Sequence, residues 1–358
     1  MTLPVRRALG LMSGTSLDGI DIAFLKTDGA AHIEAGPWHT EPYDPALRQK
    51  LRSVLGGIGP IAEVERELTL EHARVVKEFL LQHELGRVDL VGLHGHTILH
   101  RPHEGRTWQI GDGALLAASI GIDVVADFRS NDVAAGGEGA PLAPVFHAGL
   151  AARLERPIAV LNLGGVGNVT WLGSDPEALL AFDTGPGNAL IDDWALRHTG
   201  TPFDRDGALA ATGRVDSDYV ERFLRHPFFS RSPPKSLDRD DFAGWAPHHL
   251  APADGAATLA AMSVAAVRAG ARHFPTPVRR WLVTGGGRHN PTLMSALRHA
   301  LDVGVEAVEG VGWQGDALEA QAFAYLAVRS HAGLPLSFPG TTGVQVPLTG
   351  GRLYQPNP

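Results

Sequence analysis

One local plan occurs twice in this chain, and it limits the folds that the chain can adopt. Residues 9–25 read LGLMSGTSLDGIDIAFL and residues 157–172 read PIAVLNLGGVGNVTWL, so each apolar run breaks at a glycine-rich turn and then resumes. A strand, a tight turn and a second strand form a β-hairpin. The chain has 358 residues, which is enough for two domains. The repeat therefore predicts two related units that each begin with a hairpin and face each other across a cleft.

Strands and helices are expected to alternate after each hairpin. Short apolar runs such as VDLVGLHG and DVVADFR are separated by segments with helical spacing, which predicts an α/β fold. Strands are expected at 5–12, 20–26 and 32–40, and helices at 45–56, 61–85, 252–273 and 316–333. The stretch 203–245, rich in proline and glycine, predicts a long excursion, and the tail 335–358 is expected to be irregular.

Composition and charge exclude several classes of site and partner. The chain has no cysteine, which rules out disulfides, thiolate zinc sites and cysteine nucleophiles. No apolar run approaches the roughly 18 residues of a membrane span, and the first residues lack a signal-peptide core, so a cytoplasmic location is expected. The net charge is −8 without a basic cluster, so nucleic acid is not an expected partner. An anionic substrate must be held by local groups.

Two common phosphate-binding motifs are absent. The four lysines are Lys26, Lys50, Lys77 and Lys235, and none of them follows a glycine-rich loop of the G-x-x-x-x-G-K-[ST] type. Thr170 stands where the third glycine of a G-x-G-x-x-G motif would fall. Phosphate binding in this chain must therefore depend on backbone N–H groups, hydroxyls and a cation.

The tip of the first hairpin offers groups that suit a metal-bound phosphate. It contains Gly14, Thr15, Ser16 and Gly19. The glycines permit close approach of the backbone, and the hydroxyls are donors. Asp18 or Asp21 is a candidate ligand for Mg²⁺, directly or through water. The alternative is a plain β-hairpin with a solvated tip, because Asp-Gly is a favoured turn pair.

Two further glycine-rich turns resemble the first in kind. The second hairpin carries Gly164, Gly165, Gly167 and Asn168 at its tip. In LVTGGGRHNPTLM a strand enters the glycines 285–287 and a helix then opens at Asn290-Pro291. A helix N-terminus beside a glycine turn favours an anion or the flat approach of a nucleoside. Each turn is alternatively a tight connection between elements, but three in one chain indicate a nucleotide site.

Two charged residues are candidates for chemistry. Asp183 ends a strand and is followed by Gly-Pro-Gly, which predicts a carboxylate that points into open space as a general base requires. Alternatively it caps the helix expected near Asn188. Arg129 follows a strand and precedes a glycine-rich loop, where a guanidinium can bind a carboxylate in bidentate fashion, or form a structural salt bridge with Asp127 or Asp132.

Two other groups of polar residues allow more than one interpretation. HGHTILHRPH contains His94, His96, His100 and His103, but no carboxylate stands at ligand spacing from them. Hydrogen bonding to a sugar or to backbone is therefore predicted in preference to a metal site. Glu319 faces either solvent or a cleft, depending on the phase of its helix.

Nine blocks, taken together and in this order, resemble the anhydro-N-acetylmuramic acid kinases of bacterial cell-wall recycling. They are MSGTSLDGID, HGHTILHRP, QIGDGALLA, VADFRSNDVAAGGEGAPL, NLGGVGNVT, FDTGPGN, SPPKSLDRDDF, VTGGGRHNPTLM and DALEAQAFAYLA. The resemblance implies an actin-like fold, shared with hexokinase and Hsp70, in which two α/β domains of the RNase H-like type flank an ATP-binding cleft. It places residues 1–127 and the tail at about 334–358 in the first domain, and residues 128–333 in the second.

The resemblance also implies a reaction and a set of site residues. The family uses ATP, Mg²⁺ and water to convert 1,6-anhydro-N-acetylmuramic acid into N-acetylmuramic acid 6-phosphate, and a homodimer is expected. The ATP-binding residues would be Gly14, Thr15, Ser16, Leu17, Asp18, Gly19, Ile20, Asp21, Gly164, Gly165, Gly167, Asn168, Gly285, Gly286 and Gly287. Asp183 would be the catalytic base and Asp18 the candidate Mg²⁺ ligand. The substrate-binding residues would be His94, Thr97, Arg129 and Glu319.

Two residues depart from the usual family pattern. His96 stands where glutamine is common, and it keeps a side chain that forms hydrogen bonds. Glu138 stands where the loop usually carries glutamine, and it adds a negative charge near Arg129. Two alternatives to the family reaction remain: an actin-fold kinase acting on a free sugar or carboxylate, and a non-enzymatic actin-like ATPase that forms filaments or acts as a chaperone.

Overall fold

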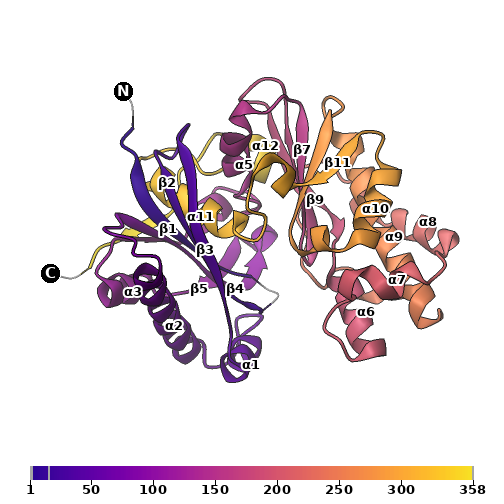
Figure 1. Cartoon of the computed structure of the whole chain (residues 1–358), viewed down its shortest axis with the longest axis horizontal. Coiled ribbons are helices and arrows are strands. Elements are labelled where there is room, and N and C mark those ends of the chain that lie inside the picture. The colour runs from indigo at the N-terminus through magenta and orange to yellow at the C-terminus, as the bar shows by residue number, and fades with distance from the viewer. Residues whose placement is uncertain (1–2, 15–16, 357–358) are drawn as a thin grey trace. The chain divides into compact units, whose positions relative to one another are not determined.

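The computed structural model describes residues 3–14 and 17–356, and these form two compact units (Figure 1). The first unit contains Met1–Arg153 and Ala317–Pro358, and the second contains Leu154–Asp316. The boundaries differ from those expected from the sequence, because residues 128–153 and 317–333 lie with the first unit. The predicted division into two α/β units, each with its own sheet, is confirmed.

The first unit begins with the three strands that the sequence predicts. Its strands are β1 (Arg6–Ser13), β2 (Gly19–Thr27), β3 (Ile33–Pro42), β4 (Leu90–Arg101), β5 (Arg106–Ile110), β6 (Val124–Ala126) and β12 (Arg352–Tyr354). Its helices are α1 (Pro45–Ser53), α2 (Ile61–Gln82), α3 (Gly113–Ile120), α4 (Ser130–Ala134), α5 (Pro144–Leu150), α11 (Leu318–His331) and α12 (Pro339–Thr342). The sheet order is β12-β6-β4-β1-β2-β3, and β5 pairs with β4.

The two faces of this sheet are covered by different helices. Leu9 and Leu11 alternate along β1 and are buried in one core with residues of α1, α2 and α3. Gly10, between them, faces α11, and a Cβ atom there would lie 1.8 Å from the carbonyl oxygen of Ala320. On β4, a Cβ at Gly92 would lie 2.1 Å from the carbonyl oxygen of Phe323. Backbone-to-backbone packing of this kind fixes α11 to the first unit.

The second unit is built around the second hairpin. Its strands are β7 (Ile158–Leu163), β8 (Val166–Leu172), β9 (Leu179–Pro186), β10 (Arg280–Thr284) and β11 (Gly304–Ala307), in the sheet order β11-β10-β7-β8-β9. Its helices are α6 (Ala189–Thr199), α7 (Ala208–Ala211), α8 (Ser217–Leu224), α9 (Pro252–Gly270) and α10 (Pro291–Ala300). Leu161, Leu163 and Phe182 face the core that α6, α9 and α10 share with the sheet.

The C-terminal tail and the excursion at 203–245 both contain helices or strands. The tail was expected to be irregular, but β12 pairs antiparallel with β6 and extends the first sheet, so that expectation was wrong. A three-residue strand has too short a pattern to be recognised without its partner. The excursion at 203–245 holds α7 and α8, and rings of Phe223, Phe228 and Phe242 pack together there.

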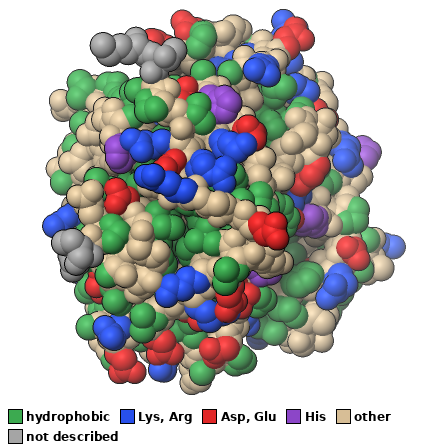
Figure 2. Space-filling view, turned by 60° about the vertical axis from the view of Figure 1, so that its left-hand side comes forward, with side chains coloured by type: hydrophobic (Ala, Val, Ile, Leu, Met, Phe, Trp, Pro, Cys, Tyr) green, Lys and Arg blue, Asp and Glu red, His purple; other side chains and the backbone are tan. Residues whose placement is uncertain are grey.

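The helices and surface of the described residues carry two further features. None of the helices within 3–14 and 17–356 is sufficiently long and apolar to span a bilayer. On the face shown in Figure 2, acidic and basic side chains are interspersed with apolar ones.

Candidate active site

A row of polar side chains crosses four strands of the second sheet. Thr284 on β10 pairs with Asn162 on β7, Asn162 pairs with Asn168 on β8, and Asn168 pairs with Asp183 on β9. Side chains directly opposite in paired strands point to the same face. Their strand neighbours Leu161, Leu163 and Phe182 face the core, so the row lies on the other face. The sheet therefore presents two amides, a hydroxyl and a carboxylate in line.

Asp183 is partly exposed and is held by a neighbouring segment. The register of β8 and β9 shifts by one residue between Asn168 and Gly167, so β9 bulges directly after Asp183. The backbone N–H of Leu237 donates to Asp183 Oδ2 at 2.8 Å, and the Asp183 N–H donates to the Lys235 carbonyl at 3.0 Å. Helix α6 has Asn188 as its N-cap residue, without a side-chain cap. These bonds favour an oriented carboxylate over a helix cap.

Three turn glycines of the second unit have room for a Cβ atom. A Cβ at Gly164, Gly165 or Gly286 would find no atom closer than 3.6 Å, and none of the three has a positive φ. Neither the backbone nor packing within the chain requires glycine at these positions. Asn188 links the two turns, because its N–H donates to the Gly164 carbonyl at 2.7 Å and a Cβ at Gly286 would lie 3.9 Å from its Nδ2. The glycines at 164, 165 and 286 are therefore candidates for a role other than packing.

The other glycines of these turns are required by the fold. Gly285 has φ +76°, and a Cβ there would lie 2.3 Å from Asn162 Oδ1. At Gly167 it would lie 2.8 Å from Thr184 Oγ1, and at Gly287 it would lie 2.6 Å from Leu163 Cβ. After this turn Asn290 caps α10, as its side chain accepts from the Leu293 N–H at 3.0 Å. The predicted helix start at Asn290-Pro291 is confirmed.

The first hairpin is described on both sides of its tip. Thr15 and Ser16 lie outside the described residues. Leu17 has φ +60°, a rare backbone conformation for a branched residue, and its N–H donates to the Gly14 carbonyl at 3.1 Å. The Asp18 side chain is exposed, whereas its carbonyl accepts from the Tyr43 N–H at 3.1 Å.

The start of β2 is constrained by its packing against β3. A Cβ at Gly19 would lie 2.2 Å from the carbonyl oxygen of Glu41, so glycine is required where β2 meets β3. Ile20 is fully buried in the core of the first unit. Asp21 Oδ1 accepts from Thr40 Oγ1 at 2.5 Å across the same pair of strands. Asp18 is therefore the exposed carboxylate of this hairpin, and Asp21 is bound to its neighbour.

A buried polar chain lies beneath this hairpin. Ser13, the last residue of β1, bonds to the Tyr43 hydroxyl at 2.5 Å and to His96 Nδ1 at 2.9 Å. Burial is the largest cause that lowers the pKa of His96 to about 4, and the pKa of nearby His72 is lowered to about 4 in the same way. Both imidazoles are therefore neutral at neutral pH. The base of the hairpin is a buried group of hydroxyls and neutral rings.

Arg129 is held in place by His94. His94 Nδ1 donates to the Gly95 carbonyl at 2.8 Å, so Nε2 carries the lone pair that accepts from Arg129 Nε at 3.3 Å and Nη2 at 3.0 Å. Burial and the Arg129 charge hold the pKa of His94 well below its usual range. Arg129 Nη1 donates to the Gly139 carbonyl at 2.8 Å. His94 is 5% exposed, which makes it a support for the guanidinium.

The loop after Arg129 is tied down by the C-terminal tail. Asp132 Oδ1 accepts from the Gly139 N–H at 2.7 Å, and its Oδ2 accepts from Thr342 Oγ1 at 2.6 Å. The Glu138 N–H donates to the Thr342 carbonyl at 2.7 Å. Asp132 is 2% exposed. This carboxylate, which the sequence offered as a partner for Arg129, therefore shapes the loop that presents the guanidinium.

Several expected site residues lie at one end of the first sheet. Strands β1, β4 and β6 are parallel; Ser13 ends β1 and Arg129 follows β6. His94 lies within β4, between Leu93 and His96, which pair with Leu11 and Ser13 at the end of β1. Helix α11 begins at the same end, since Ala317 and Ala320 pack with Ala23 and Met12. Its first turn carries Glu319, whose side chain is exposed. Thr97, further along β4, accepts from Gln109 Nε2 at 3.3 Å. Ligands of α/β sheets commonly bind at such an end.

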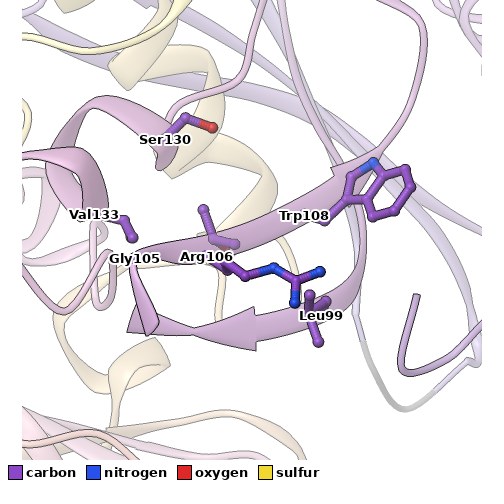
Figure 3. Close-up of a pocket in the computed structure, with 7 residues that line it drawn as sticks. Leu99, Gly105, Arg106, Trp108, Ser130 and Val133 are labelled. Atoms are coloured by element: carbon purple, nitrogen blue, oxygen red, sulfur yellow. The ribbon is translucent and has the colours of Figure 1, made fainter. Parts of the chain in front are cut away.

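A hollow lies beside the Arg129 loop (Figure 3). It measures about 210 Å³ and is lined by Leu99, Gly105, Arg106, Thr107, Trp108, Ser130 and Val133. Figure 3 shows Arg106 and Trp108 on β5, with Ser130 and Val133 on the adjoining α4 segment. Val133 also faces Gly139, where a Cβ would lie 2.5 Å from its Cγ2. One side of the loop is therefore packed and the other is open.

Three residues of these sites had no role in the sequence analysis. Asn162 interrupts the apolar run IAVLNL one residue before the end of β7, and that interruption was the available signal. Thr342 could not be recognised, because its partner Asp132 is distant in sequence. Lys235 was noted only as a lysine without a glycine-rich loop. Among the described residues, no three His, Asp or Glu side chains form a group that could hold a metal ion.

Comparison with known proteins extends over nearly the whole chain. The family described as anhydro-N-acetylmuramic acid kinase matches residues 6–356. Anhydro-N-acetylmuramic acid kinase of Paramagnetospirillum magneticum is 61% identical, covering 98% of this chain and 99% of that protein. The protein of the same name from Rhodospirillum rubrum is 53% identical, covering 97% and 94%.

The solved structures that match this chain have much lower sequence identity to it. The activator of 2-hydroxyisocaproyl-CoA dehydratase from Clostridium difficile, with bound ADPNP, has a TM-score of 0.47 and 12% identity, covering 91% of this chain and 96% of that one. A ROK family glucokinase from Streptomyces griseus with glucose and AMPPNP has a TM-score of 0.40 and 14% identity, covering 90% and 99%. The family match and the near full-length relatives decide the assignment: this chain belongs to the anhydro-N-acetylmuramic acid kinase family.

Proposed function

We propose that this chain opens 1,6-anhydro-N-acetylmuramic acid with water and phosphorylates O6 from ATP, giving N-acetylmuramic acid 6-phosphate and ADP for peptidoglycan recycling. The observation that carries the proposal is the partly exposed carboxylate of Asp183, oriented by the Leu237 N–H in a polar row of the second sheet. Relatives that carry this enzyme name over their full length support it.

The proposed chemistry places one proton transfer on Asp183. The O6 atom of an anhydro sugar belongs to the ring acetal, so it accepts a phosphoryl group only as the C1–O6 bond breaks. Asp183 takes a proton from a water molecule, whose oxygen bonds to C1. The electron pair of the broken C1–O6 bond stays on O6, which bonds to the γ-phosphorus as ADP leaves. In this scheme the phosphoryl group replaces the proton that a glycosidase acid would supply.

Residues of the first unit are proposed to bind the sugar. Arg129, fixed by His94 and the Gly139 carbonyl, keeps a guanidinium at the carboxyl end of the sheet, where it suits the carboxylate of the substrate. Glu319 is exposed at the first turn of α11 and can accept from sugar hydroxyls. Thr97 is proposed as a further sugar contact. Glu138 lies within the same loop, and its charge favours hydroxyl groups over a second carboxylate.

ATP is proposed to bind through the glycine turns. Space beside Gly164, Gly165 and Gly286 suits phosphate and nucleoside groups, and Gly14 begins the corresponding turn of the first unit. The exposed Asp18 fits Mg²⁺, because this ion commonly takes one or two protein carboxylates together with water and substrate phosphates. When bound, Mg²⁺ would neutralise charge on the transferred phosphoryl group.

Product analysis in ¹⁸O-labelled water tests the proposed reaction. With the anhydro sugar and ATP, we expect label at C1 of the phosphorylated product and one ADP for each product molecule. Free N-acetylmuramic acid, supplied separately, identifies a kinase that acts on an existing hydroxyl. A phosphorylated product of the anhydro sugar without ¹⁸O at C1 would contradict cleavage by water.

Location and assembly are also part of the proposal. The absence of cysteine from the sequence favours a cytoplasmic protein, and family membership favours a homodimer. Cell fractionation tests the first, and sedimentation equilibrium of the purified chain tests the second.

A further inference from the structure

Lys235 is a buried lysine whose backbone contacts Asp183. The proposed reaction assigns no role to its side chain. It is 2% exposed, although lysine is rarely buried without a charged or polar partner. Its carbonyl accepts from the Asp183 N–H at 3.0 Å, and two residues later the Leu237 N–H donates to Asp183 Oδ2 at 2.8 Å. The segment 235–237 therefore holds both the backbone and the side chain of Asp183.

The Lys235 ammonium lies in an aromatic environment. Nζ donates to the Phe228 carbonyl at 3.1 Å, and it lies 4.4 Å from the Phe228 ring centroid and 5.7 Å from that of Phe182. Cation–π contacts and one carbonyl offset only part of the cost of removing an ammonium from water. A methionine would fill this volume at lower cost. The presence of lysine at this position is therefore best explained by a role for its positive charge.

Two charged groups, Arg231 and Asp183, act on the pKa of Lys235 in opposite directions. Burial is the largest cause that lowers the Lys235 pKa, to about 8, and the positive charge of Arg231 lowers it further. Asp183 acts in the opposite direction and raises that pKa, so the two charges attract. His273 also faces Lys235, and its own pKa is lowered by burial and by the lysine. At neutral pH the lysine is protonated, and Asp183 is the carboxylate whose charge raises its pKa.

We propose that Lys235 is a positioning residue for Asp183: its buried ammonium anchors the 235–237 segment beside β9 and stabilises the ionised carboxylate. The inference depends on the proposed role of Asp183 as the base. An ionised base is needed to take the proton from water, so a nearby positive charge extends activity to lower pH. The Phe228 carbonyl fixes the ammonium in the place where it acts.

The pH dependence of kcat/KM separates this role from a structural one. Lys235→Gln keeps a donor for the Phe228 carbonyl and removes the charge, and Lys235→Arg keeps the charge. We expect the acid limb of the Lys235→Gln profile to move upward by roughly half a pH unit or more. We expect Lys235→Arg to restore the wild-type limb. Lys77→Gln, at an exposed lysine of α2, is the matched control and leaves the profile unchanged.

The outcomes distinguish this inference from the proposed function. Wild-type protein that does not turn over the anhydro sugar contradicts the proposed function itself. An active wild type and a folded Lys235→Gln variant with an unmoved acid limb overturn the role of Lys235 alone. If Lys235→Gln does not fold, Lys235→Met, which fills the same volume without the charge, is measured in its place. An acid limb that moves upward in this variant supports the role, and an unmoved limb overturns it.

Discussion

At Asp183, the carboxylate oxygen Oδ2 accepts from the Leu237 N–H, and the side chain keeps partial exposure. The Leu237 N–H orients the carboxylate, and partial exposure leaves room for water. Glycine, proline and a strand end predicted the position of this residue in the chain. They did not predict the 235–237 segment, because a partner some 50 residues away leaves no local signal.

Replacing Asp183 with asparagine tests its role as the base. Asp183→Asn keeps the size of the side chain and an oxygen that can accept from Leu237, but an amide cannot take a proton from water. We expect kcat to fall by roughly 10²–10⁴-fold, with the Kd for ATP near normal. Steady-state kinetics and calorimetric ATP titration measure the two quantities. Asp218→Asn, at an exposed carboxylate of α8, is the control, and an active Asp183→Asn variant would refute the assignment.

Among the elements, turns and helix contacts use glycine for different reasons. Gly286 is open on the side where a Cβ would stand, whereas Gly10 lies against the backbone of α11. The sequence alone does not distinguish Gly286 from Gly10. Their neighbours in space separate a glycine that leaves room for a ligand from one that permits packing.

A methyl group at Gly286 tests the proposed nucleotide contact. Gly286→Ala meets only Asn188 Nδ2 at 3.9 Å and has no positive φ, so the thermal midpoint should change little. We expect the KM for ATP to rise by about tenfold, equivalent to about 1.4 kcal/mol, because the methyl group would occupy ligand space. Gly304→Ala, whose Cβ would have no neighbour within 4 Å, is the control. An unchanged KM for ATP in Gly286→Ala would argue against nucleotide binding at this turn.

A methyl group at Gly10 tests the packing of α11 on the first sheet. The Cβ of Gly10→Ala would lie 1.8 Å from the Ala320 carbonyl oxygen and 2.5 Å from the Ala324 nitrogen, so α11 must move. We expect a loss of stability of about 1–3 kcal/mol, read as a lower midpoint in chemical denaturation. Gly86→Ala, with no neighbour within 4 Å, should unfold like the wild type. Equal midpoints for the two variants would contradict this packing.

At the scale of the whole molecule, buried neutral histidines are concentrated in the first unit. Burial lowers the pKa values of His72, His96, His100 and His147 to about 4, and that of His94 lies well below its usual range. The unfolded chain takes up these protons near pH 6.5, whereas the folded chain does not. The first unit is therefore fully stable above about pH 6.5 and loses stability as the pH falls toward 4.

Substitution of one histidine tests this acid sensitivity. His96→Gln removes a group that titrates and keeps a side chain able to bond to Ser13. We expect the difference in unfolding free energy between pH 7.5 and pH 5 to shrink by about 1–2 kcal/mol, since each depressed pKa contributes about 1.4 kcal/mol per pH unit. Urea denaturation at both pH values measures it. His103→Gln, at an exposed ring, should retain the wild-type difference, and equal behaviour of the two variants would contradict the assignment.

The sequence by itself determined the class of fold, the two hairpins, the start of α10 and the family to which the chain belongs, because glycine turns, apolar periodicity and block order are local and additive signals. Tertiary structure alone decided that α11 and residues 128–153 lie with the first unit, and that β12 completes its sheet. It also decided that Asn162, Asn168 and Asp183 form one row. These features depend on strand pairing and on backbone contacts between distant residues, and neither leaves a pattern along the chain.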